Sequence, residues 1–379
     1  MRLSKSSITI CFSLLAMVVF FILGQPVMMD DGFHYEGFTE SLAEGKLDFK
    51  SFYGFQGLSF FAVPIFWLTN SHHSIIFASM IFTLLSIPLI YFCAKTLYGT
   101  AKAGIYGIII FLLMPYPYVT LMRGFQEAAL LFFTLLVIYG ALNQKKWTPI
   151  AWAVGGIVKP FALVLFPLFL KEAFFKKRLI WLIGGLMLGL IYIGLTYYQT
   201  GHLVNNAAIN SYQGNFNTGN PPPLGKSFVL GAKGYLRVGA NLLLHFRKIM
   251  LSPFIIVLGA LSLLWNKNLK LRKEIILAIM LNFLLVGSLT FSFSKYLLPM
   301  TTLFALASVG YLLKYKWLMI LVFADSLFVF FPIWNYFGKV FWNSLPVFLI
   351  PFWTALAIYL IYEFTSRHRY INSDLKRER

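Results

Sequence analysis

Residues 8–36, ITICFSLLAMVVFFILGQPVMMDDGFHYE, join a long apolar run to a group of acidic side chains. Six of the chain's 13 acidic residues fall between positions 30 and 48, namely Asp30, Asp31, Glu36, Glu40, Glu44 and Asp48. Carboxylates are costly near lipid, so a cluster directly after an apolar run indicates a functional site at a membrane surface. This stretch predicts a membrane scaffold that holds the acidic cluster at one face.

The composition is that of a membrane protein. Hydrophobic residues make up 59% of the 379, charged residues only 12%, and mean hydropathy is +0.74, whereas soluble domains carry about 25% charged residues. The net charge of +19 would suggest nucleic-acid binding in a soluble protein. Here Lys and Arg lie mainly in short loops between apolar runs, as the positive-inside rule predicts. We therefore expect one membrane-embedded domain, residues 1–379, and no nucleic-acid partner.

The first outer loop, residues 25–70, is expected to contain a short helix. Glu36, Glu40 and Glu44 recur every four residues, so they share one helical face opposite apolar side chains, and Gly45 is the expected stop. The pattern predicts an amphipathic helix on the outer membrane surface. A solvated loop helix with only a packing role explains it equally well. Residues 52–70 are apolar, but we interpret them as re-entrant or interfacial, because a full span would invert the basic loops that follow.

The remaining apolar runs predict an all-α, polytopic fold with about twelve transmembrane helices and both termini inside. The single spans are expected at residues 8–24, 73–94, 103–120, 127–143, 178–198, 249–265, 274–292, 297–313, 317–335 and 344–364. Residues 148–171 have basic pairs on both flanks, which favours a hairpin of two short helices with its tip at residues 155–160. Residues 199–248 form a long outer loop, and residues 367–379 a basic inner tail.

This topology gathers charged side chains on the outer face. They are Asp30, Asp31, Arg123, Glu127, Lys159, Lys295 and the basic residues of the 199–248 loop, including Arg237. A carboxylate can deprotonate an attacking hydroxyl, and a cation can neutralise a departing phosphate. The adjacent Asp30 and Asp31 also suit a divalent metal, since hard cations take oxygen ligands. Charge composition leaves both roles open.

The order of these landmarks resembles the GT-C superfamily of integral-membrane glycosyltransferases, in particular the branch of protein O-mannosyltransferases and the aminoarabinose transferase of lipid A. Three family motifs have counterparts here. An acidic pair after the first membrane helix is matched by Asp30-Asp31, an Arg followed by an acid in the second outer loop by Arg123 and Glu127, and a late basic-Tyr-x-x-Pro element by Lys295-Tyr296-Leu297-Leu298-Pro299. The pattern differs in having Glu127 where Asp is usual and Lys295 where Arg is common.

The resemblance implies transfer of a sugar from a polyprenyl phosphate to a lipid, glycan or protein acceptor, typically with inversion, at the outer face of a cytoplasmic (inner) membrane. It makes Asp30 or Asp31 the base, with Glu127 supporting the acceptor or a metal. A divalent metal on Asp30 and Asp31 is the alternative, and no other cofactor is implied. The expected substrate-binding residues are Arg123, Lys159, Arg237, Lys295, Tyr296 and Glu36, with Lys295 as the phosphate contact.

Several candidates also have purely structural explanations. Asp30 and Asp31 could cap the surface helix. Glu127 could pair with Arg123 at i, i+4. Lys159, like Lys295, could be a snorkelling helix-end anchor.

Two other functions compete with the enzyme. A transporter or flippase for lipid-linked saccharides would use the same basic residues, but it needs buried charges along a path through the membrane. Asp325, inside a predicted span, is a functional candidate by default, yet few such residues are present. A non-enzymatic assembly subunit would keep its function when Asp30 and Asp31 are neutralised.

Overall fold

The computed structural model is helical throughout, and its described residues contain no strand. The structure describes residues 4–24, 26–28, 31–52, 54–114, 118, 122–175, 179–201, 253–287, 294–333 and 345–377. Asp30, Arg237 and residues 202–248 of the predicted long loop lie outside these ranges, and for Lys295 only the backbone is described.

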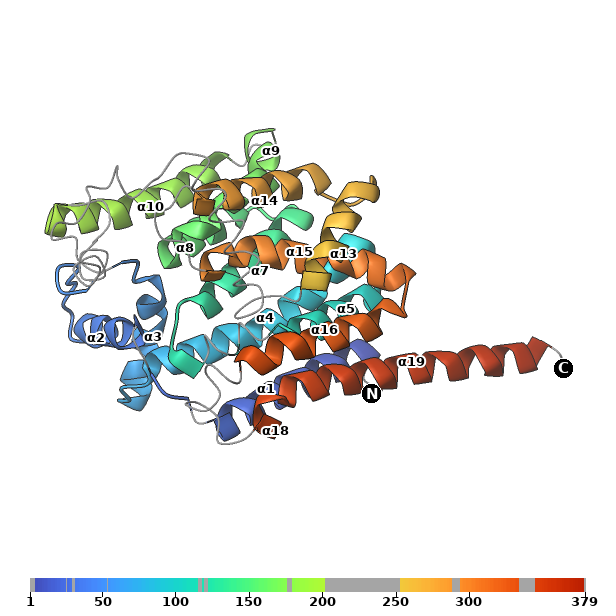
Figure 1. The fold of residues 1–379 in the computed structure, drawn as a ribbon. Coiled ribbons are helices and arrows are strands. Elements are labelled where there is room, and N and C mark those ends of the chain that lie inside the picture. Colours follow the sequence, from blue (N-terminus) through green and yellow to red (C-terminus); the bar gives the residue numbers. More distant parts are fainter. Residues whose placement is uncertain are drawn as a thin grey trace.

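Most helices run roughly parallel to one another (Figure 1). Three of them, α1 (Lys5–Gly24), α4 (Ser74–Tyr98) and α10 (Leu179–Thr200), are long and apolar enough to cross a membrane. The bundle also contains α5 (Ala101–Leu112), α7 (Glu127–Leu142), α8 (Thr148–Val158), α9 (Pro167–Phe175), α13 (Pro253–Trp265), α14 (Arg272–Gly287), α15 (Leu298–Lys314), α16 (Leu318–Ile333), α18 (Leu345–Phe348) and α19 (Ile350–Arg377). This is the all-α, polytopic membrane fold that the hydropathy pattern predicts. The count of twelve crossings stays a prediction.

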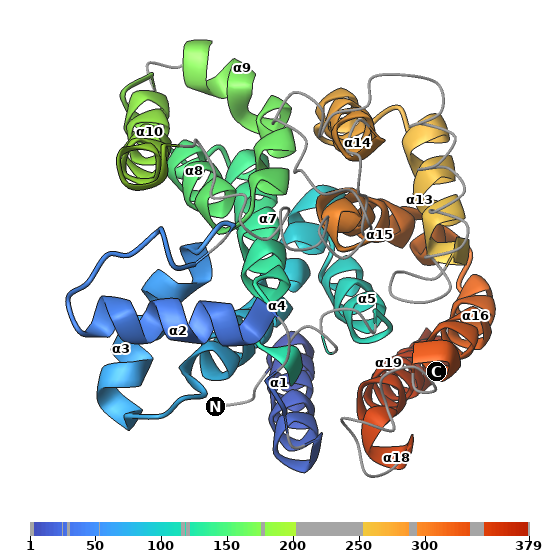
Figure 2. The ribbon, with the colours of Figure 1, turned by 60° about the vertical axis from the view of Figure 1, so that its left-hand side comes forward.

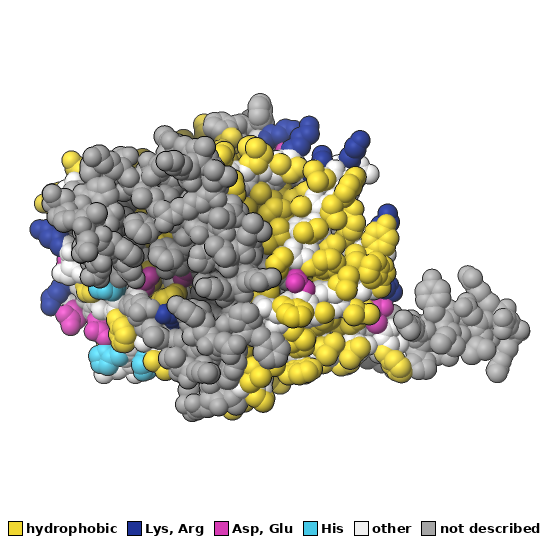
Figure 3. Space-filling model, viewed as in Figure 1, with side chains coloured by type: hydrophobic (Ala, Val, Ile, Leu, Met, Phe, Trp, Pro, Cys, Tyr) yellow, Lys and Arg dark blue, Asp and Glu magenta, His cyan; other side chains and the backbone are white. Residues whose placement is uncertain are grey.

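The centre of the bundle is made by α4, α5, α7 and α15, with the other helices around them (Figure 2). The side chains of α5 from Ala103 to Leu112 are all buried. At the periphery α10 exposes large apolar side chains along its length, including Ile180, Leu190 and Tyr198. Such a surface belongs against lipid rather than water. In the view of Figure 3, hydrophobic side chains form a broad band, and acidic and His side chains gather at the end that carries α2 and α3.

Both chain ends lie at the end of the bundle away from α2 and α3 (Figure 1). At that end Glu363 of α19 accepts hydrogen bonds from Tyr106 (3.0 Å) and Lys316 (3.0 Å), and Lys102 lies 3.3 Å away. The same-side placement of the termini agrees with the predicted topology.

A helix does form in the first loop, as predicted. α2 spans Asp31–Ala43, and Gly45 follows it with φ +79°, a left-handed conformation that glycine adopts without strain. α2 packs against α3 (Gly57–Thr69) through the fully buried Phe38. The ring of Phe38 lies edge-on to those of Phe52 and Phe60, with centroids 5.6 and 5.9 Å away.

The expected polar face of α2 is not uniformly solvated, because Glu36 is only 4% exposed. Its carboxylate accepts hydrogen bonds from the Ser74 hydroxyl (2.6 Å), the Ser74 N–H (3.3 Å) and the Ile75 N–H (2.8 Å). Glu36 therefore satisfies donors at the start of α4, which has no side-chain cap of its own. Burial raises the pKa of Glu36, and these hydrogen bonds partly offset the rise.

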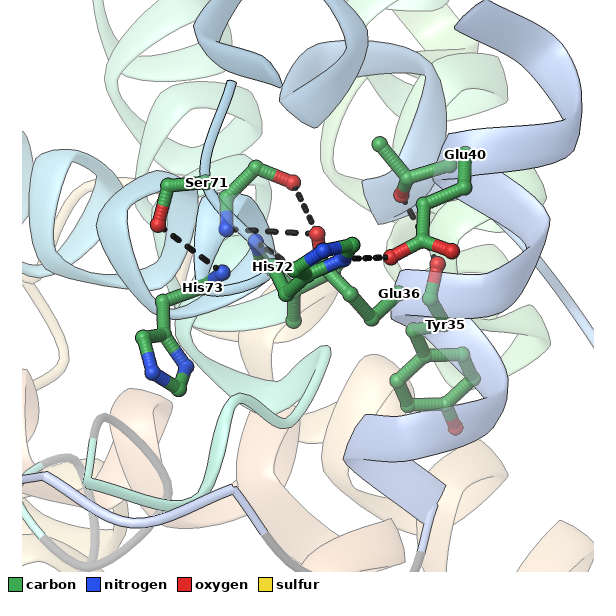
Figure 4. A network of polar contacts seen from close by, with 9 residues as sticks. Tyr35, Glu36, Glu40, Ser71, His72 and His73 are labelled. Atoms are coloured by element: carbon green, nitrogen blue, oxygen red, sulfur yellow. Dashed lines mark hydrogen bonds and ion pairs between the residues drawn. The ribbon is translucent and has the colours of Figure 1, made fainter. Parts of the chain in front are cut away.

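A second contact from α2 reaches the connection between α3 and α4 (Figure 4). Oε1 of Glu40 lies 2.5 Å from Nδ1 of His72, and this hydrogen bond raises the pKa of His72 above its usual value. The α3 helix has 13 residues, a rise of about 20 Å, which is short of the roughly 30 Å hydrocarbon core. Its length favours the interfacial interpretation of residues 52–70, which stays a prediction.

The first loop is also tied to α10. Gln199 donates from Nε2 to the Leu47 carbonyl (2.6 Å) and accepts at Oε1 from the Phe49 N–H (2.8 Å). About two turns nearer the N-terminus of α10, the Tyr192 hydroxyl accepts a hydrogen bond from the Gln56 N–H at 3.0 Å. These bonds join the loop to α10 at two levels.

The hairpin predicted for residues 148–171 is present. α8 ends at Val158, the 3-10 helix η1 (Pro160–Leu165) follows, and α9 continues the chain. Lys159 between them is extended, with φ −153° and ψ 133°, as expected for a residue before proline. Trp152 Nε1 donates to the Leu163 carbonyl at 3.0 Å, which holds η1 against α8. Lys159 thus lies at the tip.

Asp325, the intramembrane acid that the sequence leaves without a partner, has a structural role. Its Oδ2 accepts from the Phe254 N–H at 3.1 Å, at the start of α13. This carboxylate therefore supplies the cap that α13 needs.

Removing the cap on α4 should destabilise the protein. Glu36→Leu would leave the buried Ser74 and Ile75 donors unsatisfied, at about 2–4 kcal/mol in total, whereas Glu36→Gln keeps one acceptor oxygen and should cost less. Thermal unfolding of the purified protein in detergent measures both. The exposed Glu44→Gln serves as control, and a Glu36→Leu protein as stable as wild type would contradict the capping role.

The hydrogen bond with Glu40 should raise the pKa of His72. Because the folded-state pKa of His72 is raised above 6.5, its contribution to stability is complete below that pH and is lost as pH rises through the raised value. NMR titration of the His72 ring should give a pKa above 6.5 that drops in Glu40→Gln. An identical pKa in both proteins would show that Glu40 is not the cause.

Candidate functional site

An ion pair buried between α7 and the tip of the α8 hairpin forms the centre of the site. Glu127, the first residue of α7, accepts a hydrogen bond from Nζ of Lys159. The Glu127 side chain is 1% exposed and that of Lys159 10% exposed. Charges this deeply buried are costly unless they are paired. The extended backbone at the hairpin tip brings the ammonium to α7 across 32 residues of sequence.

Glu127 does not form the helical i, i+4 pair with Arg123 that the sequence suggested as its structural role. Gly124, with φ +69°, interrupts the helix, and α7 begins only at Glu127. The i, i+4 geometry therefore does not apply, and Lys159 takes the carboxylate. The guanidinium of Arg123 instead lies 4.7 Å from the Phe125 ring centroid.

Tyr296 adjoins this ion pair. Its ring centroid is 5.9 Å from Nζ of Lys159, and it stacks on Phe161 with centroids 4.3 Å apart. Asn282 of α14 holds the segment, donating to the Tyr296 carbonyl and accepting from the Met300 N–H, both at 3.1 Å. The 3-10 helix η3 (Ser294–Leu297) therefore places the backbone of Lys295 next to the hairpin tip.

The starts of α3 and α7 meet at the same place. Gln126 donates from Nε2 to the Phe55 carbonyl. Gly57 approaches the hairpin so closely that a Cβ there would lie 2.5 Å from the Val158 Cα and N atoms. Neither helix start has a side-chain cap from its own N-cap residue. Uncapped N–H groups carry partial positive charge, so this corner combines two helix N-termini with the Lys159 ammonium.

The acidic end of α2 lies beside Arg123. A Cβ on Gly32 would come within 2.5 Å of the Arg123 carbonyl oxygen, and the Val27 N–H donates to the Met122 carbonyl at 3.1 Å. Asp31, half-buried next to Gly32, is thus near the second loop. A shared apolar cluster that includes Tyr35, Ala128 and Val158 connects α2 with α7 and the hairpin.

The structure thus brings together Glu127, Lys159 and Tyr296, and it places Asp31 beside the Arg123 backbone. Glu36 lies on α2 with its carboxylate used at α4, so its role in substrate binding stays a prediction. Asp30 and Arg237 lie outside the described residues, as does the Lys295 side chain. The sequence did not single out Gln126 or Phe161, because neither carries a charge or belongs to a motif.

Metal binding is not decided by these residues. In the part of the chain that the structure describes, no three His, Cys, Asp or Glu side chains are close enough to hold an ion. Asp30 is outside that part, so the metal alternative for Asp30 and Asp31 stays open.

Comparison with known proteins finds a similar fold but no sequence relative. No protein-family model and no curated protein matches the chain. The crystal structure of ArnT from Cupriavidus metallidurans bound to undecaprenyl phosphate matches with a TM-score of 0.61 and 14% identity, covering 94% of this chain and 76% of ArnT. The apo structure of that ArnT matches with a TM-score of 0.57 and 14% identity, covering 92% and 74%. At this identity the likeness establishes the fold alone, which is a polytopic helical fold like that of ArnT.

The buried pair should show strong energetic coupling. Glu127→Leu removes the carboxylate from the buried Lys159 ammonium, which should cost about 3–5 kcal/mol, whereas Glu127→Leu with Lys159→Leu should cost less than the two single changes added together. Unfolding in detergent measures this double-mutant cycle. Glu44→Leu is the control, because Glu44 and its partner Lys46 are both exposed and the loss should be smaller. Additive costs would exclude coupling.

Proposed function

We propose that this chain is a membrane glycosyltransferase that moves a sugar from a polyprenyl-phosphate donor to an acceptor hydroxyl. The observation that carries the proposal is the buried pair of Glu127 and Lys159 beside Tyr296, at the end of a scaffold shaped like ArnT. Ionisable side chains inside an apolar scaffold are retained mainly for function. The undecaprenyl phosphate bound by that ArnT supports a lipid-phosphate donor here.

In the proposed reaction, Asp30 or Asp31 takes the proton of the acceptor hydroxyl as its oxygen attacks the anomeric carbon. The bond from that carbon to the phosphate oxygen breaks, and the electron pair leaves with polyprenyl phosphate. Attack opposite the leaving group inverts the anomeric centre. Lys295, with Arg237 and Lys159, supplies positive charge near the phosphate as its own charge develops.

The remaining predicted residues complete the proposed site. Glu127 supports the acceptor or a metal, and Arg123, Tyr296 and Glu36 contribute to substrate binding. The acceptor is a lipid, a glycan or a protein. Arg123 has fixed geometry suited to a phosphate or carboxylate, and its backbone neighbour Gly32 brings Asp31 to the same corner.

We place the site on the outer face of a cytoplasmic membrane. Lys102 and Lys316 lie with Glu363 at the end that carries both termini, and basic residues near span ends favour the inner side. The end with α2 and α3 would then face outward, where a lipid-borne donor enters from the bilayer.

Transfer should depend on the acidic pair. Membranes carrying wild type, Asp30→Asn/Asp31→Asn or the exposed-loop control Glu44→Gln would receive labelled polyprenyl-phosphate sugars and a crude extract of acceptors. Wild type and control should move label to an acceptor, and the double variant should lose about a hundredfold or more of the rate. Equal transfer by all three would remove the pair from the mechanism.

Two further readouts separate the alternatives in the same experiment. If wild-type activity is lost with a chelator and restored by Mg²⁺ or Mn²⁺, the pair holds a metal rather than acting as the base. If the lipid crosses vesicle membranes with no transfer of label, the protein is a flippase and the proposed enzyme activity is wrong.

A further inference from the structure

Two oxygen atoms at the start of α7 are buried with no hydrogen bond. They are Oε1 of Gln126 and Oε2 of Glu127, on side chains 0% and 1% exposed, and within the described part of the chain neither has a hydrogen-bond partner. A buried acceptor without a donor costs free energy. Proteins rarely keep such atoms unless a ligand or water fills the place.

The hydrogen bonds on either side fix these atoms as acceptors. The amide nitrogen of Gln126 must face the Phe55 carbonyl, because two carbonyl oxygens would not bond, so Oε1 is the remaining atom. Oε1 of Glu127 is taken by Lys159, which leaves Oε2. These two oxygens therefore need hydrogen-bond donors from a ligand.

Two kinds of ligand are disfavoured at these two oxygen atoms. A phosphate presents acceptor oxygens, which would face acceptors here. A divalent cation would be repelled by the Lys159 ammonium, which sits on the same carboxylate. A neutral group rich in hydroxyl donors remains, and carbohydrate has that chemistry.

The neighbours of Lys159 indicate how such a group would lie. Its ammonium bonds Glu127 and lies 5.9 Å from the ring centroid of Tyr296, which stacks on Phe161 and follows Lys295 in the chain. A cation therefore lies beside the two hydroxyl-binding oxygens. A sugar joined to a phosphate presents a partner for each.

We infer that Gln126 and Glu127 bind hydroxyl groups of the sugar carried by the polyprenyl-phosphate donor, with Lys159 between the sugar and the phosphate. The inference rests on the proposed function. It assigns Gln126, which belongs to no family motif, to donor recognition, and it gives Glu127 a contact with the donor sugar.

Lipid binding by the purified full chain in nanodiscs tests this. The probes are undecaprenyl phosphate alone and undecaprenyl phosphate carrying glucose, mannose or N-acetylglucosamine. Wild type should bind at least one sugar-bearing lipid about tenfold more tightly than the bare lipid. Gln126→Leu removes one acceptor, and Glu127→Gln lets an amide keep Lys159 while presenting a donor at the second position. Both should lose the sugar preference.

Thermal unfolding of each variant in detergent provides the control for folding. Glu363→Gln, at the other end of the bundle, should keep the preference. Should either variant fold poorly, Glu127→Gln with Lys159→Gln gives a neutral pair that removes the buried charge and should also lose the preference.

Other results would overturn the inference. If the sugar preference survives in both variants, or is absent from wild type, the corner does not bind the donor sugar. If the preference needs a divalent cation, the oxygens are metal ligands. Unchanged donor binding together with a raised KM for the acceptor would assign them to the acceptor. If wild type binds neither lipid, the proposed function fails first.

Discussion

The buried pair of Glu127 and Lys159 is the interaction on which the arrangement of this end of the bundle depends. The Lys159 ammonium lies at the tip of a hairpin made of apolar helices, where a buried charge without a counter-charge is costly. Glu127 at the start of α7 provides the negative charge. The hairpin is thereby fixed against α7, and the start of α3 closes over its last residues at Gly57. The ring of Tyr296, stacked on that of Phe161, also lies close to the Lys159 ammonium. One electrostatic requirement thus brings together segments from four parts of the chain.

The other buried or partly buried carboxylates follow a different rule. Glu36 serves the first N–H groups of α4, Asp325 serves those of α13, and Glu363 is shared between a tyrosine and two lysines. In each case the acid accepts hydrogen bonds from uncapped N–H groups at a helix start, or pairs with basic side chains at one end of the bundle. Glu127 is different, because only one of its oxygens is used. The other acids therefore stabilise the fold, whereas Glu127 keeps one oxygen atom that can bind a ligand.

Local signals in the sequence were sufficient for much of the fold. The spacing of glutamates and Gly45 located α2, and Pro160 with flanking basic pairs located the hairpin tip. The partners of the charged residues could not be obtained in this way. Nothing in the sequence relates Glu127 to a lysine 32 residues later, and spacing favoured Arg123 until the break at Gly124 was visible. The capping roles of Glu36 and Asp325 were hidden for the same reason, since each serves a different helix.

The bonds of Gln199 have a mechanical consequence. α10 has 22 residues, about 33 Å of helix, and its outward side chains are apolar. A helix of this kind adjusts its tilt and depth to match the hydrocarbon around it. Gln199 is hydrogen-bonded to the backbone of the loop at Leu47 and Phe49. We therefore expect the loop that leads back to Asp31 to move with α10 along the membrane normal. The thickness of the surrounding bilayer therefore sets the height of the acidic loop above the lipid.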